Sequence, residues 1–100
     1  MDLKTFKASL AEPKPPPGLS QPLRALWHVA KGGFSVNESW TAAHALAQKE
    51  ENEIGSWVHA HLHRVEGDLD NAGYWYGKAG RPPSKKSLQA EWDEIATQLL

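Results

Sequence analysis

The tryptophans of this chain constrain its fold more than any other feature, because each of the five lies in a separate segment with helical periodicity. They are Trp27, Trp40, Trp57, Trp75 and Trp92. Aromatic side chains bury a large apolar area on folding. The pattern therefore predicts one large core anchor in each helix of a small helical domain. An aromatic-lined pocket is the alternative interpretation.

Apolar residues recur with helical spacing in five long segments, and proline, glycine and capping residues separate these segments. The expected helices run from a Ser20 cap to Gly32, from a Ser35–Glu38 capping box to about Glu50, from Ile54 to Glu66, from Leu69 to Ala79, and along a last stripe of Leu88, Trp92, Ile95 and Leu99. No segment alternates like a β-strand. We therefore predict an all-α fold of five or six short antiparallel helices joined by short turns.

A proline-rich segment divides the N-terminal region from the rest of the chain. Leu3, Phe6 and Leu10 form a short helical stripe, and the stretch from Glu12 to Gly18 contains four prolines. Consecutive prolines favour an extended polyproline II path. We expect residues 1–18 to be an N-terminal arm and linker, and residues 19–100 to be one helical domain. The PxxP pattern at Pro13 and Pro16 is an alternative docking motif for an SH3-like groove.

Composition excludes several classes of function. A chain of 100 residues with a formal net charge of −1 lacks the basic surplus of a nucleic-acid-binding domain. It has no cysteine, which excludes disulfides, thiolate metal sites and cysteine nucleophiles. No apolar run has the length of a membrane span, and the N-terminus lacks the apolar region of a secretion signal. We expect a cytoplasmic protein that binds neither nucleic acid nor membrane.

Residues 54–83 resemble a single helical hairpin of the tetratricopeptide type, related to Sel1-like repeats. The matching positions are Ala60, the run from Gly67 to Ala72, Tyr76 and Ala79. The resemblance implies two closely packed antiparallel helices and a protein-binding role. Residues 20–50 are the candidate for a second, divergent hairpin, with the C-terminal helix as a cap. Ser56, His59 and His63 depart from it, standing where the family has tryptophan, leucine and tyrosine. The longer run from His59 to Arg81 also resembles an uncharacterised bacterial protein family, which implies no activity.

Three side chains of the predicted fourth helix have the spacing of metal ligands. His59, His63 and Glu66 lie at positions i, i+4 and i+7, which stacks them on one face. Two imidazoles and a carboxylate suit a divalent transition metal, with His44 of the preceding helix as a further candidate ligand. The alternative is a solvated histidine-rich face. His61 falls on the apolar face, where we expect a hydrogen-bonded core histidine.

Polar and aromatic residues gather in sequence around the turn after the fourth helix. They are Arg64, Glu66, Asp68, Asn71, Tyr74, Trp75 and Arg81. We expect Asp68 to cap the next helix and Glu66 to pair with Arg64 or Arg81. Tyr74 and Lys78 are expected on an exposed face. Gly73 and Gly77 each weaken a helix by roughly 1 kcal/mol relative to alanine, which predicts a close approach by another helix or partner.

The sequence carries no motif of an established enzyme class, which favours a non-enzymatic role. The leading hypothesis is a protein–protein interaction module that needs no cofactor and binds a protein, a peptide or a second copy of itself. Its candidate binding residues are His44, His59, His63, Glu66, Asp68, Tyr74, Trp75 and Arg81. The alternative is a small metal-binding protein or metal-dependent enzyme that holds a divalent transition metal through His59, His63 and Glu66. A third hypothesis is a small-molecule pocket lined by Trp40, His44, Trp57, His61 and Trp75.

Overall fold

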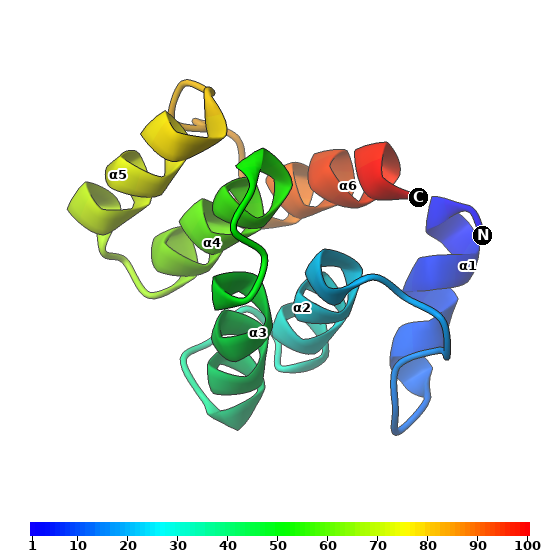
Figure 1. Ribbon diagram of the computed structural model, residues 1–100. Coiled ribbons are helices and arrows are strands. Elements are labelled where there is room, and N and C mark those ends of the chain that lie inside the picture. The colour runs from blue at the N-terminus through cyan, green and yellow to red at the C-terminus, as the bar shows by residue number, and fades with distance from the viewer.

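The computed structural model describes all 100 residues and contains six α-helices (Figure 1). Their bounds are α1 Leu3–Ala8, α2 Gln21–Lys31, α3 Glu38–Gln48, α4 Glu53–Val65, α5 Leu69–Ala79 and α6 Leu88–Leu99, with a short 3₁₀ helix, η1, at Ser9–Ala11. The structure contains no β-strand. The predicted all-α fold is therefore confirmed.

Side-chain caps set the start of each long helix. Ser20, Asp68 and Ser87 accept hydrogen bonds from main-chain N–H groups in the first turns of α2, α5 and α6. The start of α3 differs from the prediction. Its N-cap is Asn37, whose side chain accepts from the N–H of Trp40 at 3.1 Å, so the expected capping box at Ser35 is wrong.

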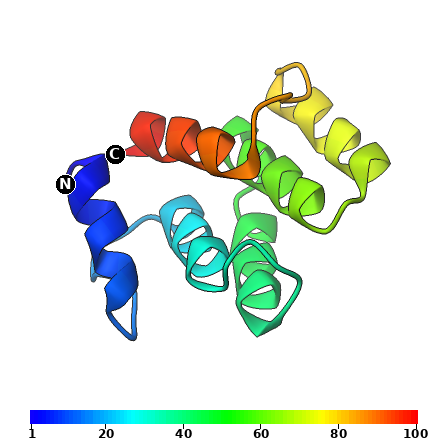
Figure 2. The same ribbon diagram turned by 180° about the vertical axis from the view of Figure 1, so that it is seen from behind.

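Helix α4 lies at the centre of the molecule. Every residue from Gly55 to His63 is buried, because α2, α3, α5 and α6 all pack against this one helix. Seen from behind, α6 crosses in front of α4 (Figure 2). The start of α4 approaches the preceding turn so closely that a Cβ added to Gly55 would lie 2.0 Å from the carbonyl oxygen of Glu50.

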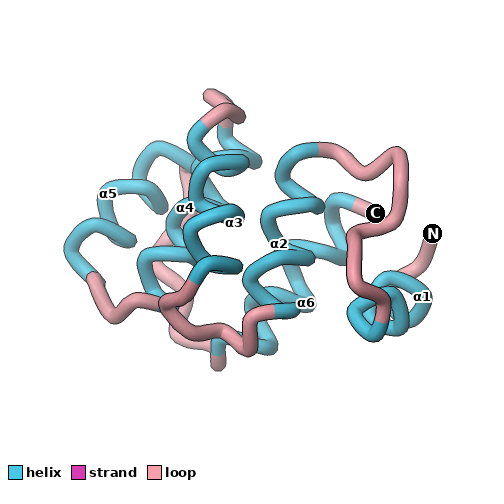
Figure 3. The backbone as a smooth tube through the Cα atoms, turned by 90° about the horizontal axis from the view of Figure 1, so that it is seen from below, coloured by secondary structure: helices cyan, strands magenta, loops and turns pink.

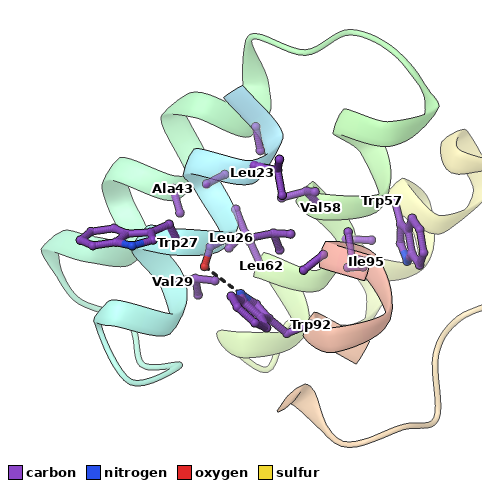
Figure 4. Packing of buried hydrophobic residues seen from close by; sticks show 14 of the residues in the cluster. Leu23, Leu26, Trp27, Val29, Ala43, Trp57, Val58, Leu62, Trp92 and Ile95 are labelled. Atoms are coloured by element: carbon purple, nitrogen blue, oxygen red, sulfur yellow. Dashed lines mark hydrogen bonds between the residues drawn. The ribbon is translucent and has the colours of Figure 1, made fainter. Parts of the chain in front are cut away.

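Three of the five tryptophans are core anchors, as predicted. Trp27, Trp57 and Trp92 are buried. The indole Nε1 of Trp92 donates to the Leu26 carbonyl at 2.7 Å and ties α6 to α2 (Figure 4). The other two, Trp40 and Trp75, are only partly buried and pack against the edge of the core.

The N-terminal segment that was expected as an arm packs against α2 and α6 (Figure 3). Phe6 has no exposed surface, and its ring stacks on Trp92 with centroids 5.5 Å apart. The Ser9 hydroxyl accepts a hydrogen bond from Trp27 Nε1 at 3.1 Å. None of the six helices has both the length and the apolar character needed to cross a membrane.

Candidate metal centre

Three histidine side chains from two helices converge between α3 and α4. His44 comes from α3, and His59 and His63 lie one turn apart on α4. One ring nitrogen from each lies within 4.8 Å of the others. The Nε2 atoms of His44 and His59 are 2.9 Å apart. The expectation of a solvated histidine face is wrong, since His59 is 2% exposed and His63 is 5% exposed.

Two tryptophans bracket this group, which we call the histidine cluster. The Trp75 ring stacks on His59 with centroids 3.8 Å apart, and the Trp40 ring stacks on His44 at 4.9 Å. Trp40 is itself fixed, because its Nε1 donates to the Leu62 carbonyl at 2.8 Å. The imidazoles are therefore held in place by indole rings on both sides.

A carboxylate orients the third histidine of the cluster. Nδ1 of His63 lies 2.6 Å from a carboxylate oxygen of Glu66. When Nδ1–H donates to that oxygen, Nε2 keeps its lone pair, which is how carboxylates orient metal-bound histidines. Glu66 was predicted as a metal ligand alongside His59 and His63. In the structure His44 is the third member of the group that could hold an ion, and Glu66 is bonded to Nδ1 of His63.

The cluster favours neutral imidazoles. Burial and the neighbouring His44 and His63 lower the pKa of His59 to about 3. Burial, followed by the proximity of His63, also lowers the pKa of His44. A neutral imidazole has one nitrogen lone pair available, and a metal ligand must be unprotonated. These two imidazoles are therefore uncharged at neutral pH, as metal ligands must be.

A hollow of about 600 Å³ opens beside the cluster, lined by His59, Trp75 and Lys78 together with the α3–α4 turn. The lining includes Glu50 and Glu51 of that turn and Glu53, the first residue of α4. Acidic side chains at the mouth of a cleft raise the local concentration of cations. The hollow thus offers an approach to His59 that favours a positively charged solute.

A second polar cluster lies on the opposite side of α4 and was not predicted. The carboxylate of Glu91 has no exposed surface and is bonded by His61 Nδ1 at 2.9 Å, by Arg64 at 2.8 Å and by the Tyr76 hydroxyl. The expected role of His61 as a hydrogen-bonded core histidine is confirmed. A sequence signal for Glu91 existed, because it lies between Leu88 and Ile95 within the apolar stripe of α6.

The polar residues expected around the α4–α5 turn do not form one cluster. Asp68 caps α5, as predicted. The expected pairing of Glu66 with an arginine is wrong, because Glu66 is bonded to His63. Arg64 is bonded to Glu91 instead. The Arg81 guanidinium carbon lies 3.4 Å from the centroid of the Trp57 ring.

The outer face of α5 is open. Tyr74 is 60% exposed and Lys78 lies over its ring. A Cβ added to Gly73 or Gly77 would meet nothing within 4 Å. No other part of this chain approaches these two glycines, so the expected close packing within the domain is wrong.

The hypothesis of a pocket lined by five aromatic side chains is also wrong. The residues are divided between two places: Trp40, His44 and Trp75 belong to the histidine cluster, whereas His61 bonds Glu91 on the other side of α4. Trp57 packs against Arg81.

The chain matches no family model, no curated protein and no solved structure. The resemblance of residues 54–83 to a tetratricopeptide hairpin and to an uncharacterised bacterial family stays a prediction.

Proposed function

We propose that this protein binds one divalent transition metal ion through the imidazoles of His44, His59 and His63. The observation that carries the proposal is the position of His44. Residues i and i+4 of one helix are adjacent by geometry alone, but His44 belongs to another helix and still presents Nε2 to His59 at 2.9 Å.

The separations fit a tetrahedral ion with little movement. Zinc–imidazole bonds of about 2.0–2.1 Å place neighbouring ligand nitrogens about 3.3 Å apart at tetrahedral angles. The His44–His59 pair is slightly closer than this, and all three ligand nitrogens lie within 4.8 Å of one another. Small rotations of the rings would bring them to bonding distance.

The surroundings support binding. Glu66 is bonded to Nδ1 of His63 and orients its ring. Trp40 and Trp75 stack on the rings of His44 and His59. The pKa values of His59 and His44 are lowered. Imidazole ligands suit zinc, copper, nickel, cobalt and iron rather than magnesium or calcium. Three protein ligands leave a fourth position for water, as in catalytic zinc sites, whereas structural zinc sites use four protein ligands.

Isothermal titration of chelator-stripped protein with Zn²⁺ and Co²⁺ tests the proposal. We expect one ion per chain, and we expect His44→Ala to weaken binding by at least about tenfold, which corresponds to about 1.4 kcal/mol. His28→Ala is the matched control, because His28 lies on α2 outside the cluster. Circular dichroism checks that each variant folds. Equal affinities for the wild type and His44→Ala would refute the proposal.

The protein-binding hypothesis remains a second proposal, supported by the outer face of α5. Leu69 and Tyr74 are 69% and 60% exposed, and a Cβ added to Gly73 or Gly77 would meet nothing within 4 Å. Exposed aromatic residues are enriched in protein interfaces. Sedimentation velocity over a range of concentrations tests for self-association. Loss of the association in Tyr74→Ala would support the proposal, and a monomer at every concentration would remove the self-binding form.

A further inference from the structure

A second hollow, of about 420 Å³, lies on the far side of α4 from the histidine cluster. Its walls come from α4, α5, α6 and the loop between α5 and α6. The lining residues are Trp57, Tyr76, Arg81, Pro82, Pro83, Ser84, Lys85, Lys86, Glu91 and Glu94. We refer to it as the loop pocket. Its volume lies within the usual range for small-molecule sites.

The floor of the loop pocket is polar and fixed. Glu91 and Tyr76 both line it, and they are 0% and 1% exposed. Glu91 accepts hydrogen bonds from His61, Arg64 and Tyr76. The guanidinium of Arg64 already compensates the negative charge of this carboxylate. Burial, together with this bond to Glu91, raises the pKa of Tyr76, so its hydroxyl stays protonated. The backbone N–H of Ser84 also faces the phenolic oxygen, so a solute hydroxyl would have to use the remaining acceptor capacity of that oxygen.

The rim of the loop pocket has uncompensated positive charge. Lys86 pairs with Glu94 at 3.2 Å. The Arg81 guanidinium hydrogen-bonds the neutral side chain of Gln98, and neither Arg81 nor Lys85 is in any of the five ion pairs of the structure. Two cations therefore face the hollow without an acidic partner, although the chain as a whole carries a net charge of −1.

The loop itself is held in place before any ligand binds. Arg64 donates to the Lys86 carbonyl at 2.5 Å, the Arg81 guanidinium lies 3.4 Å from the Trp57 ring centroid, and two adjacent prolines restrict the backbone. A preorganised rim lowers the entropic cost of binding. Arginine also provides the planar donor geometry that suits carboxylate and phosphate.

We infer that the loop pocket binds a small hydroxylated organic anion. Its carboxylate or phosphate pairs with Arg81 and Lys85, and a hydroxyl group reaches the Tyr76 oxygen. This site shares no side chain with the histidine cluster. The inference does not depend on metal binding.

A series of probes that differ mainly in charge tests this inference. Glucose 6-phosphate, gluconate, glucose and glucosamine are each titrated into ¹⁵N-labelled protein in the presence of a chelator, and the amide shifts of residues 80–94 are followed. We expect saturable shifts with the two anions and none with glucose or glucosamine. The relative affinity of glucose 6-phosphate and gluconate distinguishes a phosphate from a carboxylate ligand.

Two matched variants complete the test. Arg81→Ala/Lys85→Ala should weaken anion binding at least about tenfold, whereas Arg24→Ala, which removes an exposed cation on α2, should not change it. The inference would be overturned if binding survived in the double variant or if Arg24→Ala weakened it equally. Stronger binding of glucosamine, or no saturable shift with either anion, would also overturn it. The chelator keeps these outcomes separate from the outcome of the metal titration.

Discussion

The Nε2 atoms of His44 and His59 lie 2.9 Å apart, although the residues belong to different helices and are 15 positions apart in sequence. Burial of His59, followed by the proximity of His44 and His63, lowers the pKa of His59 to about 3. One imidazole must donate to the other in the absence of an ion. A metal ion would replace that single bond with two coordinate bonds.

The role of Glu66 gives the first prediction. Removal of a carboxylate that orients a metal-bound histidine lowers metal affinity by about 10–100-fold. Glu66→Ala should therefore weaken zinc binding by this factor, measured by calorimetry. His63, Glu66 and Asp68 form a second candidate ligand group. Asp68→Asn is the matched control, and an equal loss in that variant would assign the ion to the second group.

The buried Glu91 carboxylate predicts an acid-sensitive component of stability. Burial by itself raises the pKa of Glu91, but hydrogen bonds from His61, Tyr76 and Arg64 outweigh it and hold the pKa at about 2. Because the unfolded value of 4.5 is higher, the unfolded state binds more protons between these values. This contribution is complete above pH 4.5 and is lost as pH falls toward 2.

Glu91→Gln should flatten this part of the acid-unfolding profile in urea titrations. It should also lower the free energy of unfolding at pH 7 by about 3–5 kcal/mol, because Arg64 loses its buried partner. Glu94→Gln alters a partly exposed pair with Lys86 and should change stability by about 1 kcal/mol or less. An unaltered acid profile in Glu91→Gln would contradict this account.

Two glycine-to-alanine substitutions should have opposite effects on thermal stability. A methyl group at Gly77 meets nothing within 4 Å in α5, so Gly77→Ala should stabilise the protein by about 0.5–1 kcal/mol. A methyl group at Gly55 would lie 2.0 Å from the Glu50 carbonyl oxygen, so Gly55→Ala should destabilise it. Calorimetric melting temperatures compare the two, and a lower value for Gly77→Ala would contradict the open face of α5.

The docking of α1 depends on Phe6. Its fully buried ring stacks on Trp92, and removal of a buried phenylalanine costs about 3–5 kcal/mol. In Phe6→Ala we expect amide hydrogen exchange to accelerate in α1 while α4 amides stay protected. Met1→Ala, at a position 59% exposed, is the control. Slow exchange in α1 of Phe6→Ala would show that other contacts hold it.

The helices could be predicted from sequence because their signals are local. Periodicity and caps predict α2 and α5, and periodicity alone predicts α6. The start of α3 was misplaced, since Asn37 competes equally well with Ser35 for the N-cap position. The face of α4 that carries His59 and His63 was correctly grouped. The burial of this face could not be predicted, because a helical wheel shows which side chains share a face of one helix. It does not show which neighbouring helices cover that face.

The partners of the polar side chains depend on tertiary contacts. The predicted pairing of Glu66 with Arg64 or Arg81 is wrong, because α6 brings Glu91 to Arg64 across 27 positions in the sequence. His44 was considered only as a further ligand, because the α3–α4 crossing that brings it to His59 has no local sequence signal. Glu91 could have been found from its place in an apolar stripe.

Anomalous diffraction at the zinc absorption edge, from crystals grown with zinc, tests the central claim most directly. The account predicts one anomalous peak within about 2.0–2.1 Å of a ring nitrogen from each of His44, His59 and His63. The Nδ1 atom of His63 should remain bonded to Glu66. A peak at the Glu66 and Asp68 carboxylates, or no ordered ion at the histidine cluster at saturating zinc, would contradict it.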